Sequence, residues 1–367
     1  MKDAIAEVLK CCSNPTVARS DSATLSRRAA LVGDWDALVS QAEAHGVGPL
    51  VYAHLRAAGV PVPDDAMRQI RGIYLQHRYR NQLHEKILCD VVTRFATLGL
   101  DLLVVKGAAL SHLIYPEPGL RPMSDIDILV KASDSDRIEA AVRELGFRTF
   151  SPKGPVVKKS LPTALLCLDG VRIGLEIHYD LFEPGYAASF RLEDMRGMPL
   201  RFAPGKLGLA AQTLGYEQTL WHLAHHLMFH TTVFDSFRLI WAADIVGFAE
   251  RFAVDIDWEL IRTRYPIVIE ILSLLHFAIP LSEPLLERGA IPLGRAAGQV
   301  LEDFEGWPRA AMADQWEKGL LGIAEDTLSP PEWWLRLHHG LGSARDVFWY
   351  RWIAHPMEIL GWVKQLL

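Results

Sequence analysis

The sequence has few cysteines, and they are not spaced as a disulfide framework or a metal site would require. Only four occur, at Cys11, Cys12, Cys89 and Cys167, and no CxxC spacing is present. Adjacent cysteines rarely meet the geometry of a disulfide, so Cys11 and Cys12 are not expected to pair. Reduced thiols are typical of the cytoplasm, and we therefore expect a cytoplasmic protein.

Long apolar segments and an excess of basic charge are also missing. The longest apolar stretch, residues 267–281, is interrupted by Glu270, His276 and Pro280, whereas a membrane helix needs about 20 apolar residues. The first residues, MKDAIAEVLKCC, are polar every few positions, unlike a signal peptide. The net charge of −6 disfavours a large nucleic-acid-binding surface. We expect a soluble protein with no membrane segment and no nucleic-acid partner.

The pattern of apolar and turn residues divides the chain into three regions. Residues 1–98 are expected to be helical, with one long helix over residues 65–98. In residues 99–205, short apolar runs alternate with helical segments, as in an α/β core. Residues 206–367 are helical again and rich in tryptophan and aliphatic side chains. The predicted fold class is α+β, a mixed β-sheet core with helices, flanked by N-terminal and C-terminal helical regions.

Local signals give more detail in the middle region. The run LDLLVV at residues 100–105 predicts a strand that leads into a helix. A second helix is expected over residues 133–146, with Ser133 as its cap. The dipeptide Asp169-Gly170 separates two apolar runs, which predicts a tight β-hairpin.

Four Asp-x-Asp pairs occur, and three of them, at residues 34–36, 125–127 and 255–257, are candidates for helix capping or for chemistry. The first and third pairs precede predicted helices, where aspartate caps free backbone N–H groups. Asp125 and Asp127 instead lie in the apolar strand DIDILV, so both carboxylates point to one face, roughly 6–7 Å apart. Neighbouring carboxylates repel each other, and a divalent cation such as Mg²⁺ would relieve that repulsion. A solvent-facing edge strand is the alternative.

Four residues near this pair fit a bound phosphate group. Lys106 and Gly107 lie at a strand-to-helix junction, where a glycine permits close backbone approach and a helix N-terminus attracts anions. Arg121 and Ser124 precede the aspartates and offer a cation and a hydroxyl. Each signal alone is weak, since such turns are common and an isolated arginine usually lies on the surface.

A third carboxylate is expected on a neighbouring strand. In VRIGLEIHYD, residues 171–180, Glu176 and His178 share the more polar face. Glu176 there could hold a metal or accept a proton from an attacking hydroxyl. Without that context it would be a surface carboxylate.

The segment WHLAHHLMFH places His222, His226 and His230 on one helical stripe. Three interpretations stay open: a semi-polar packing face, a wall of the active cleft that contacts substrate, and a zinc site that lacks the usual His-Glu-x-x-His motif. Asp244 is alone in the apolar run LIWAADIVGF and needs a partner if buried. A histidine or Arg238 is the expected partner.

The motifs KGAAL, YPEPGLRPMSDIDILV and EIHYDL, within residues 99–180, resemble the bacterial nucleotidyltransferase-like proteins of the DNA polymerase β superfamily. The resemblance is to a largely uncharacterised group, some of whose members are encoded beside peptide-maturation enzymes. It implies that Gly107 is the turn glycine, that Asp125 and Asp127 bind metal, and that Glu176 is the third carboxylate. Lys106-Gly107 stands where the superfamily has Gly-Ser or Gly-Gly.

The resemblance implies a metal-dependent transferase that moves a nucleoside monophosphate from a nucleoside triphosphate, with ATP as the expected donor. The metal is expected to be Mg²⁺ or Mn²⁺, and the acceptor a hydroxyl or phosphate on a peptide or small molecule. A nucleotide- or partner-binding protein without turnover is the alternative, and a metal-dependent nuclease is disfavoured by the acidic charge balance. The predicted site comprises Asp125, Asp127 and Glu176 as catalytic metal ligands, Lys106, Gly107, Arg121 and Ser124 for nucleotide, and His178, His222 and His226 for substrate.

Overall fold

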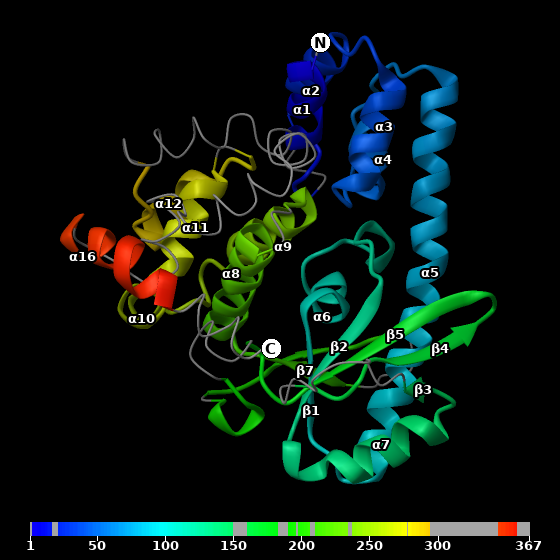
Figure 1. Cartoon of the computed structure of the whole chain (residues 1–367). Coiled ribbons are helices and arrows are strands. Elements are labelled where there is room, and N and C mark those ends of the chain that lie inside the picture. Colours follow the sequence, from blue (N-terminus) through cyan, green and yellow to red (C-terminus); the bar gives the residue numbers. More distant parts are fainter. Residues whose placement is uncertain are drawn as a thin grey trace. The chain divides into compact units, whose positions relative to one another are not determined.

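The structure of the chain is a computed structural model (Figure 1). It divides into two compact units. The first comprises Met1–Leu223 and Leu239–Asp257, and the second comprises Ala224–Arg238 and Trp258–Leu367. The residues described are 2–16, 21–149, 160–182, 190–195, 197–205, 210–233, 237–276, 278–293 and 344–357.

Helices make up the N-terminal part of the first unit and flank its sheet, and further helices form the described part of the second unit. The helix α8 crosses from one unit to the other, and α10, α11, α12, α16 and the π-helical turn η5 belong to the second. Their bounds are α1 Lys2–Cys11, α2 Ser22–Ala29, α3 Trp35–Ala44, α4 Gly48–Ala57, α5 Asp64–Thr97, α6 Lys106–Leu113, α7 Ser135–Glu144, α8 Tyr216–Val233, α9 Leu239–Arg251, α10 Trp258–Arg264, α11 Ile267–Leu275, α12 Glu283–Gly289, α16 Ala344–Trp349 and η5 Tyr350–Ala354.

A five-stranded mixed sheet forms the centre of the first unit, in the order β1-β2-β5-β4-β3. β2 and β5 are parallel, and every other neighbouring pair is antiparallel. A separate two-stranded sheet joins β6 and β7. This mixed sheet with many helices confirms the predicted α+β class. The strands are β1 Leu102–Val105, β2 Asp125–Val130, β3 Arg148–Thr149, β4 Ala164–Leu168, β5 Val171–His178, β6 Leu200–Phe202 and β7 Ala211–Thr213.

Alternation along the strands gives the sheet two different faces. On one face Ile126 and Ile128 of β2 lie in the main core with Ile177 of β5, and α5 and α7 contribute to the same core. Figure 1 shows α5 as the long helix that runs from the N-terminal helices down to the sheet. Phe95 of α5 is fully buried there, and burial of such a side chain stabilises the fold by about 1.5–3 kcal/mol. The carboxylates of β2 and β5 lie on the opposite face of the sheet.

The observed elements bear out most of the expected ones. The long helix predicted over residues 65–98 is α5, and Asp34 caps α3 through a hydrogen bond from the Ala37 backbone N–H. The cap expected at Ser133 is wrong. A 3-10 turn, Ala132–Asp134, precedes α7, and no side chain caps that helix. The extra turn takes Ser133 away from the position that a capping side chain requires.

The hairpin expected at Asp169-Gly170 is confirmed between β4 and β5. Both residues have positive φ, at 50° and 78°, which is the backbone conformation of a two-residue type I′ turn. The turn fixes the register of β5, and therefore the face on which Glu176 lies.

The predicted boundary near residue 98 falls between α5 and β1. Because α5 packs in the core of the sheet, the two predicted regions share one hydrophobic core. The division into residues 1–98, 99–205 and 206–367 stays a prediction. All four cysteines are free thiols. Within the described ranges, no helix combines the length and apolar character that crossing a bilayer requires.

Candidate active site

The pairing of β2 with β5 places two of the predicted carboxylates side by side. In this parallel register Asp127 is opposite Glu176, and Asp125 is opposite Gly174. Asp127 is almost fully buried, with 5% of its side chain exposed, whereas 37% of the Glu176 side chain is exposed. The result is one buried and one accessible carboxylate at the same level of the sheet.

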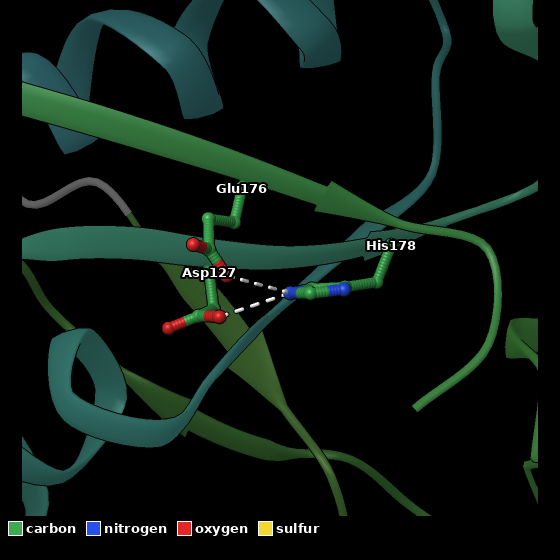
Figure 2. Close-up of side chains that lie close together, drawn as sticks. All are labelled: Asp127, Glu176 and His178. Atoms are coloured by element: carbon green, nitrogen blue, oxygen red, sulfur yellow. Dashed lines mark hydrogen bonds and ion pairs between the residues drawn. The ribbon is translucent and has the colours of Figure 1, made fainter. Parts of the chain in front are cut away.

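His178 completes a close group with these two carboxylates. Its Nε2 atom lies 2.9 Å from Oδ1 of Asp127 and 3.6 Å from Oε2 of Glu176, as Figure 2 shows. Burial lowers the pKa of His178, but its contacts with Asp127 and Glu176 outweigh burial and raise it. The strand periodicity predicted the correct face for His178, but the only role predicted for it was a contact with substrate.

Lys106 contacts the same oxygen of Asp127 from the other side. It is the first residue of α6, it has an uncommon positive φ of 52°, and its Nζ lies 2.6 Å from Oδ1 of Asp127. Burial opposes ionisation of Asp127, but Lys106 and His178 prevail and hold the pKa of that carboxyl well below its usual range. A strained backbone at such a position is typical of functional sites.

Asp125 is charged less readily than its neighbour. Burial, followed by the negative charges of Asp127 and Glu176, raises its pKa from 3.8 to about 6. Among the described residues, the Ser124 hydroxyl donates the one side-chain hydrogen bond that Asp125 accepts, at 3.1 Å. Asp125 lies outside the close group of Asp127, Glu176 and His178, so its predicted role as a metal ligand stays a prediction.

Arg121 is held inside the protein by Asp244. Its Nε and Nη2 atoms donate to the two oxygens of Asp244 at 2.6–3.1 Å, and the Tyr115 hydroxyl donates to Asp244 at 2.7 Å. The expected partner of Asp244, a histidine or Arg238, is therefore wrong. The sequence indicates that Asp244 needs a partner if it is buried. It does not identify the partner, because Arg121 is 123 positions away along the chain. The phosphate contact predicted for Arg121 stays a prediction. Its guanidinium group is already engaged in the ion pair with Asp244.

Gly107 makes room for this guanidinium. A Cβ atom at position 107 would lie 2.1 Å from Nη1 and 2.8 Å from Cζ of Arg121. The sequence assigned Gly107 to close contact with a ligand, but in the structure the close neighbour is Arg121. The Arg121–Asp244 pair thus supports the turn that carries Lys106.

We expect Gly107→Ala to destabilise the protein by about 1–3 kcal/mol, because the added methyl group overpacks a buried ion pair. The matched control is Gly72→Ala in α5, where an added Cβ meets nothing within 4 Å. That change should be neutral or stabilise the helix by up to about 1 kcal/mol. Urea unfolding followed by circular dichroism measures both, and equal midpoints for the two variants would contradict the packing argument.

Of the three histidines predicted for substrate, His222 and His226 belong to different units. His222 is buried in the first unit, where its ring meets Phe182 edge-on. His226 belongs to the second unit and contacts His230, with ring centroids 4.4 Å apart. Their substrate roles stay predictions.

The donor atoms of this site fit a divalent metal. Oxygen or nitrogen atoms of Asp127, Glu176 and His178 all lie within 4.8 Å of one another. Asp125 adds a nearby carboxylate, whose pKa is raised by burial and then by the negative charges of Asp127 and Glu176. Carboxylates and imidazole are common ligands of divalent metals in proteins. A cation would therefore relieve the repulsion that the fold creates.

Comparison with known proteins shows what this arrangement is similar to. The model of a family described as an uncharacterised nucleotidyltransferase matches residues 32–280, more than half of the chain. Among solved structures, that of the antibiotic-resistance factor ANT(2'')-Ia is similar, with 15% identity and a TM-score of 0.32 over 61% of this chain and 98% of that one. No curated protein matches the chain.

Proposed function

Since the chain belongs to this nucleotidyltransferase family, we propose that it transfers a nucleoside monophosphate from a nucleoside triphosphate, with ATP as donor, in a reaction that depends on Mg²⁺ or Mn²⁺. The observation that carries the proposal is the register of β2 and β5, which aligns Asp127 with Glu176 beside Asp125. Three carboxylates on one face of a sheet are costly unless a cation is bound between them.

Asp127, Glu176 and Asp125 would hold the metal. When bound, the metal neutralises the triphosphate and lowers the pKa of the attacking hydroxyl. Glu176 is the exposed member of the close group, so it is placed to accept the proton of that hydroxyl.

The start of α6 supports a site for the phosphates. Lys106 lies at the N-terminus of this helix with 21% of its side chain exposed. Free backbone N–H groups and the helix dipole favour an anion there, and the ammonium group adds a point charge. The Ser124 hydroxyl, next to Asp125, is a further donor for a phosphate oxygen.

The proposed acceptor is a hydroxyl or phosphate on a peptide or small molecule. The net charge of −6 supports this choice over nucleic acid. The four cysteines form no disulfide with one another, and this supports a cytoplasmic site of action.

The test is calorimetric binding of the four ribonucleoside triphosphates with Mg²⁺ and then with EDTA. Glu176→Gln removes one negative charge from the site, and Glu144→Gln, at a glutamate 59% exposed on α7, is the matched control. We expect metal-dependent binding of ATP that Glu176→Gln weakens at least tenfold and Glu144→Gln leaves unchanged. Equal binding in EDTA, or no binding of any nucleotide, contradicts the proposal.

A nucleotide-binding protein without turnover is the second candidate, favoured by the ion pair between Lys106 and Asp127. This pair already neutralises the carboxylate that a catalytic metal needs. Tight binding of a triphosphate with no release of pyrophosphate, across a panel of peptide and small-molecule acceptors, supports this second candidate over the transferase.

A further inference from the structure

His178 is positioned as a metal ligand would be, and not only as a neighbour of the carboxylates. Its ring enters the site edge-on, with Nε2 between the oxygens of Asp127 and Glu176 (Figure 2). Nδ1 lies on the opposite edge of the ring and is buried, with no hydrogen-bond partner among the described residues. The side chain is only 9% exposed, so the strand and its surroundings fix which nitrogen faces the site.

The two distances from Nε2 to the carboxylate oxygens lie close to the edge lengths of a coordination polyhedron. An ion about 2.0–2.2 Å from its ligands separates neighbouring ligand atoms by roughly 2.8–3.1 Å in octahedral and 3.3–3.6 Å in tetrahedral geometry. Nε2 lies 2.9 Å from the Asp127 oxygen and 3.6 Å from the Glu176 oxygen. Neither geometry fits both distances, so one ion can replace the hydrogen now shared with Asp127 only if the partly exposed Glu176 side chain rotates.

We propose that His178 binds the metal directly through Nε2, together with Asp127 and Glu176, and that this ligand makes the site prefer a first-row transition metal such as Mn²⁺ over Mg²⁺. The inference rests on the proposed function and deepens it by naming the class of metal. Mg²⁺ takes oxygen ligands almost exclusively, whereas first-row transition metals also accept imidazole, most strongly Fe, Ni, Cu and Zn.

Coordination requires the lone pair of Nε2. The ring hydrogen then resides on Nδ1, and any proton carried by Nε2 passes to solvent as the metal binds. Oδ1 of Asp127, the oxygen 2.9 Å from Nε2, has two lone pairs, so it can bind the ion with one and keep its contact with Lys106 through the other. No redox change is involved.

The alternative role for His178 is to orient Asp127 by a hydrogen bond, and one substitution separates the two roles. His178→Gln keeps an N–H donor for Asp127 but has no imidazole. A ligand role predicts that Mn²⁺ binding weakens at least tenfold while Mg²⁺ binding changes less than threefold. An orienting role predicts equal loss for both metals, and that result would overturn the inference.

The readout is binding of Mn²⁺ alone, without nucleotide, followed by electron paramagnetic resonance, with Mg²⁺ measured by competition. Pulsed spectra should show coupling of Mn²⁺ to a directly bound nitrogen in the wild-type protein. That coupling should disappear in His178→Gln and persist in His112→Gln, a change to a half-buried histidine that stacks on Phe202. Bound Mn²⁺ without nitrogen coupling in the wild type contradicts direct ligation.

The outcomes for the metal and for the transferase are distinguishable. Nitrogen-coupled Mn²⁺ with no nucleotide binding supports the ligand role of His178 and contradicts the proposed function. Metal-dependent nucleotide binding with equal affinity for Mn²⁺ and Mg²⁺, and no nitrogen coupling, supports the function and overturns the ligand role. A protein that binds neither metal contradicts both.

Discussion

Asp125→Asn is expected to unfold at a higher urea concentration than the wild type at pH 8 in EDTA, and to lose metal-dependent nucleotide binding. The physical reason is the raised pKa of Asp125, about 6 against an ordinary value of 3.8, caused by burial and then by the charges of Asp127 and Glu176. The folded protein resists ionisation of this carboxyl, so its charge lowers the free energy of unfolding whenever it is present.

The sign of the pH dependence follows from the proton count. Between pH 3.8 and about 6 the folded state binds more protons at Asp125 than the unfolded state does, so the free energy of unfolding falls as pH rises through this window. The penalty is absent below the window and complete above it. A shift of two pKa units corresponds to about 3 kcal/mol, and with partial exposure we expect a gain of about 1–3 kcal/mol for Asp125→Asn at pH 8.

Urea unfolding of both proteins in EDTA, at several pH values from 4 to 8, measures this effect. The advantage of the variant should shrink as pH falls through the window. Asp90→Asn, at an exposed carboxylate on α5, is the control and should change stability by no more than about 0.5 kcal/mol. If Asp125→Asn is less stable than the wild type at pH 8, the carboxylate is held by unseen favourable contacts rather than kept for a metal.

The acidic half of the site could be predicted because it depends on local periodicity. A strand that alternates Asp125, Ile126 and Asp127 must present both carboxylates on one face, and the hairpin at Asp169-Gly170 does the same for Glu176. Which strands are neighbours could not be derived from periodicity. The order β1-β2-β5 is a property of long-range pairing.

The basic half of the site could not be predicted in the same way. Both Lys106 and Arg121 were assigned to phosphate because they precede or follow predicted strands, yet each forms an ion pair with an aspartate far along the chain. Sequence spacing gives no information on such partners. Asp244 illustrates this limit, since its isolation in an apolar run revealed that it needs a cation but not which one.

Asp244→Asn, which breaks the buried ion pair of Arg121 and Asp244, is expected to cause the largest loss of stability among the single substitutions proposed. Asp244→Asn keeps the shape of the side chain and its contact with the Tyr115 hydroxyl but removes the charge. Arg121, with 10% of its side chain exposed, would then be a buried cation without its counterion. Breaking such a pair from one side typically costs about 3–5 kcal/mol.

Chemical unfolding of four proteins tests the pairing: the wild type, Asp244→Asn, Arg121→Met and the double variant. Because the double variant leaves no unpaired buried charge, it should recover at least half of the loss seen in Asp244→Asn. The matched control is Asp65→Asn, which breaks the pair of Asp65 with Arg68, side chains 82% and 72% exposed. That change should cost less than about 1 kcal/mol.

The Asp244→Asn variant and the Asp65→Asn control also show whether the pair supports the nucleotide site. The Arg121 guanidinium lies against Gly107, next to Lys106, so losing its anchor should displace the turn at the start of α6. We expect the Asp244→Asn variant, at a temperature where it remains folded, to bind ATP more weakly than the wild type while Asp65→Asn does not. If Asp244→Asn binds ATP as tightly as the wild type does, the ion pair does not support the turn, and Lys106 is positioned by its contact with Asp127 and by its own backbone.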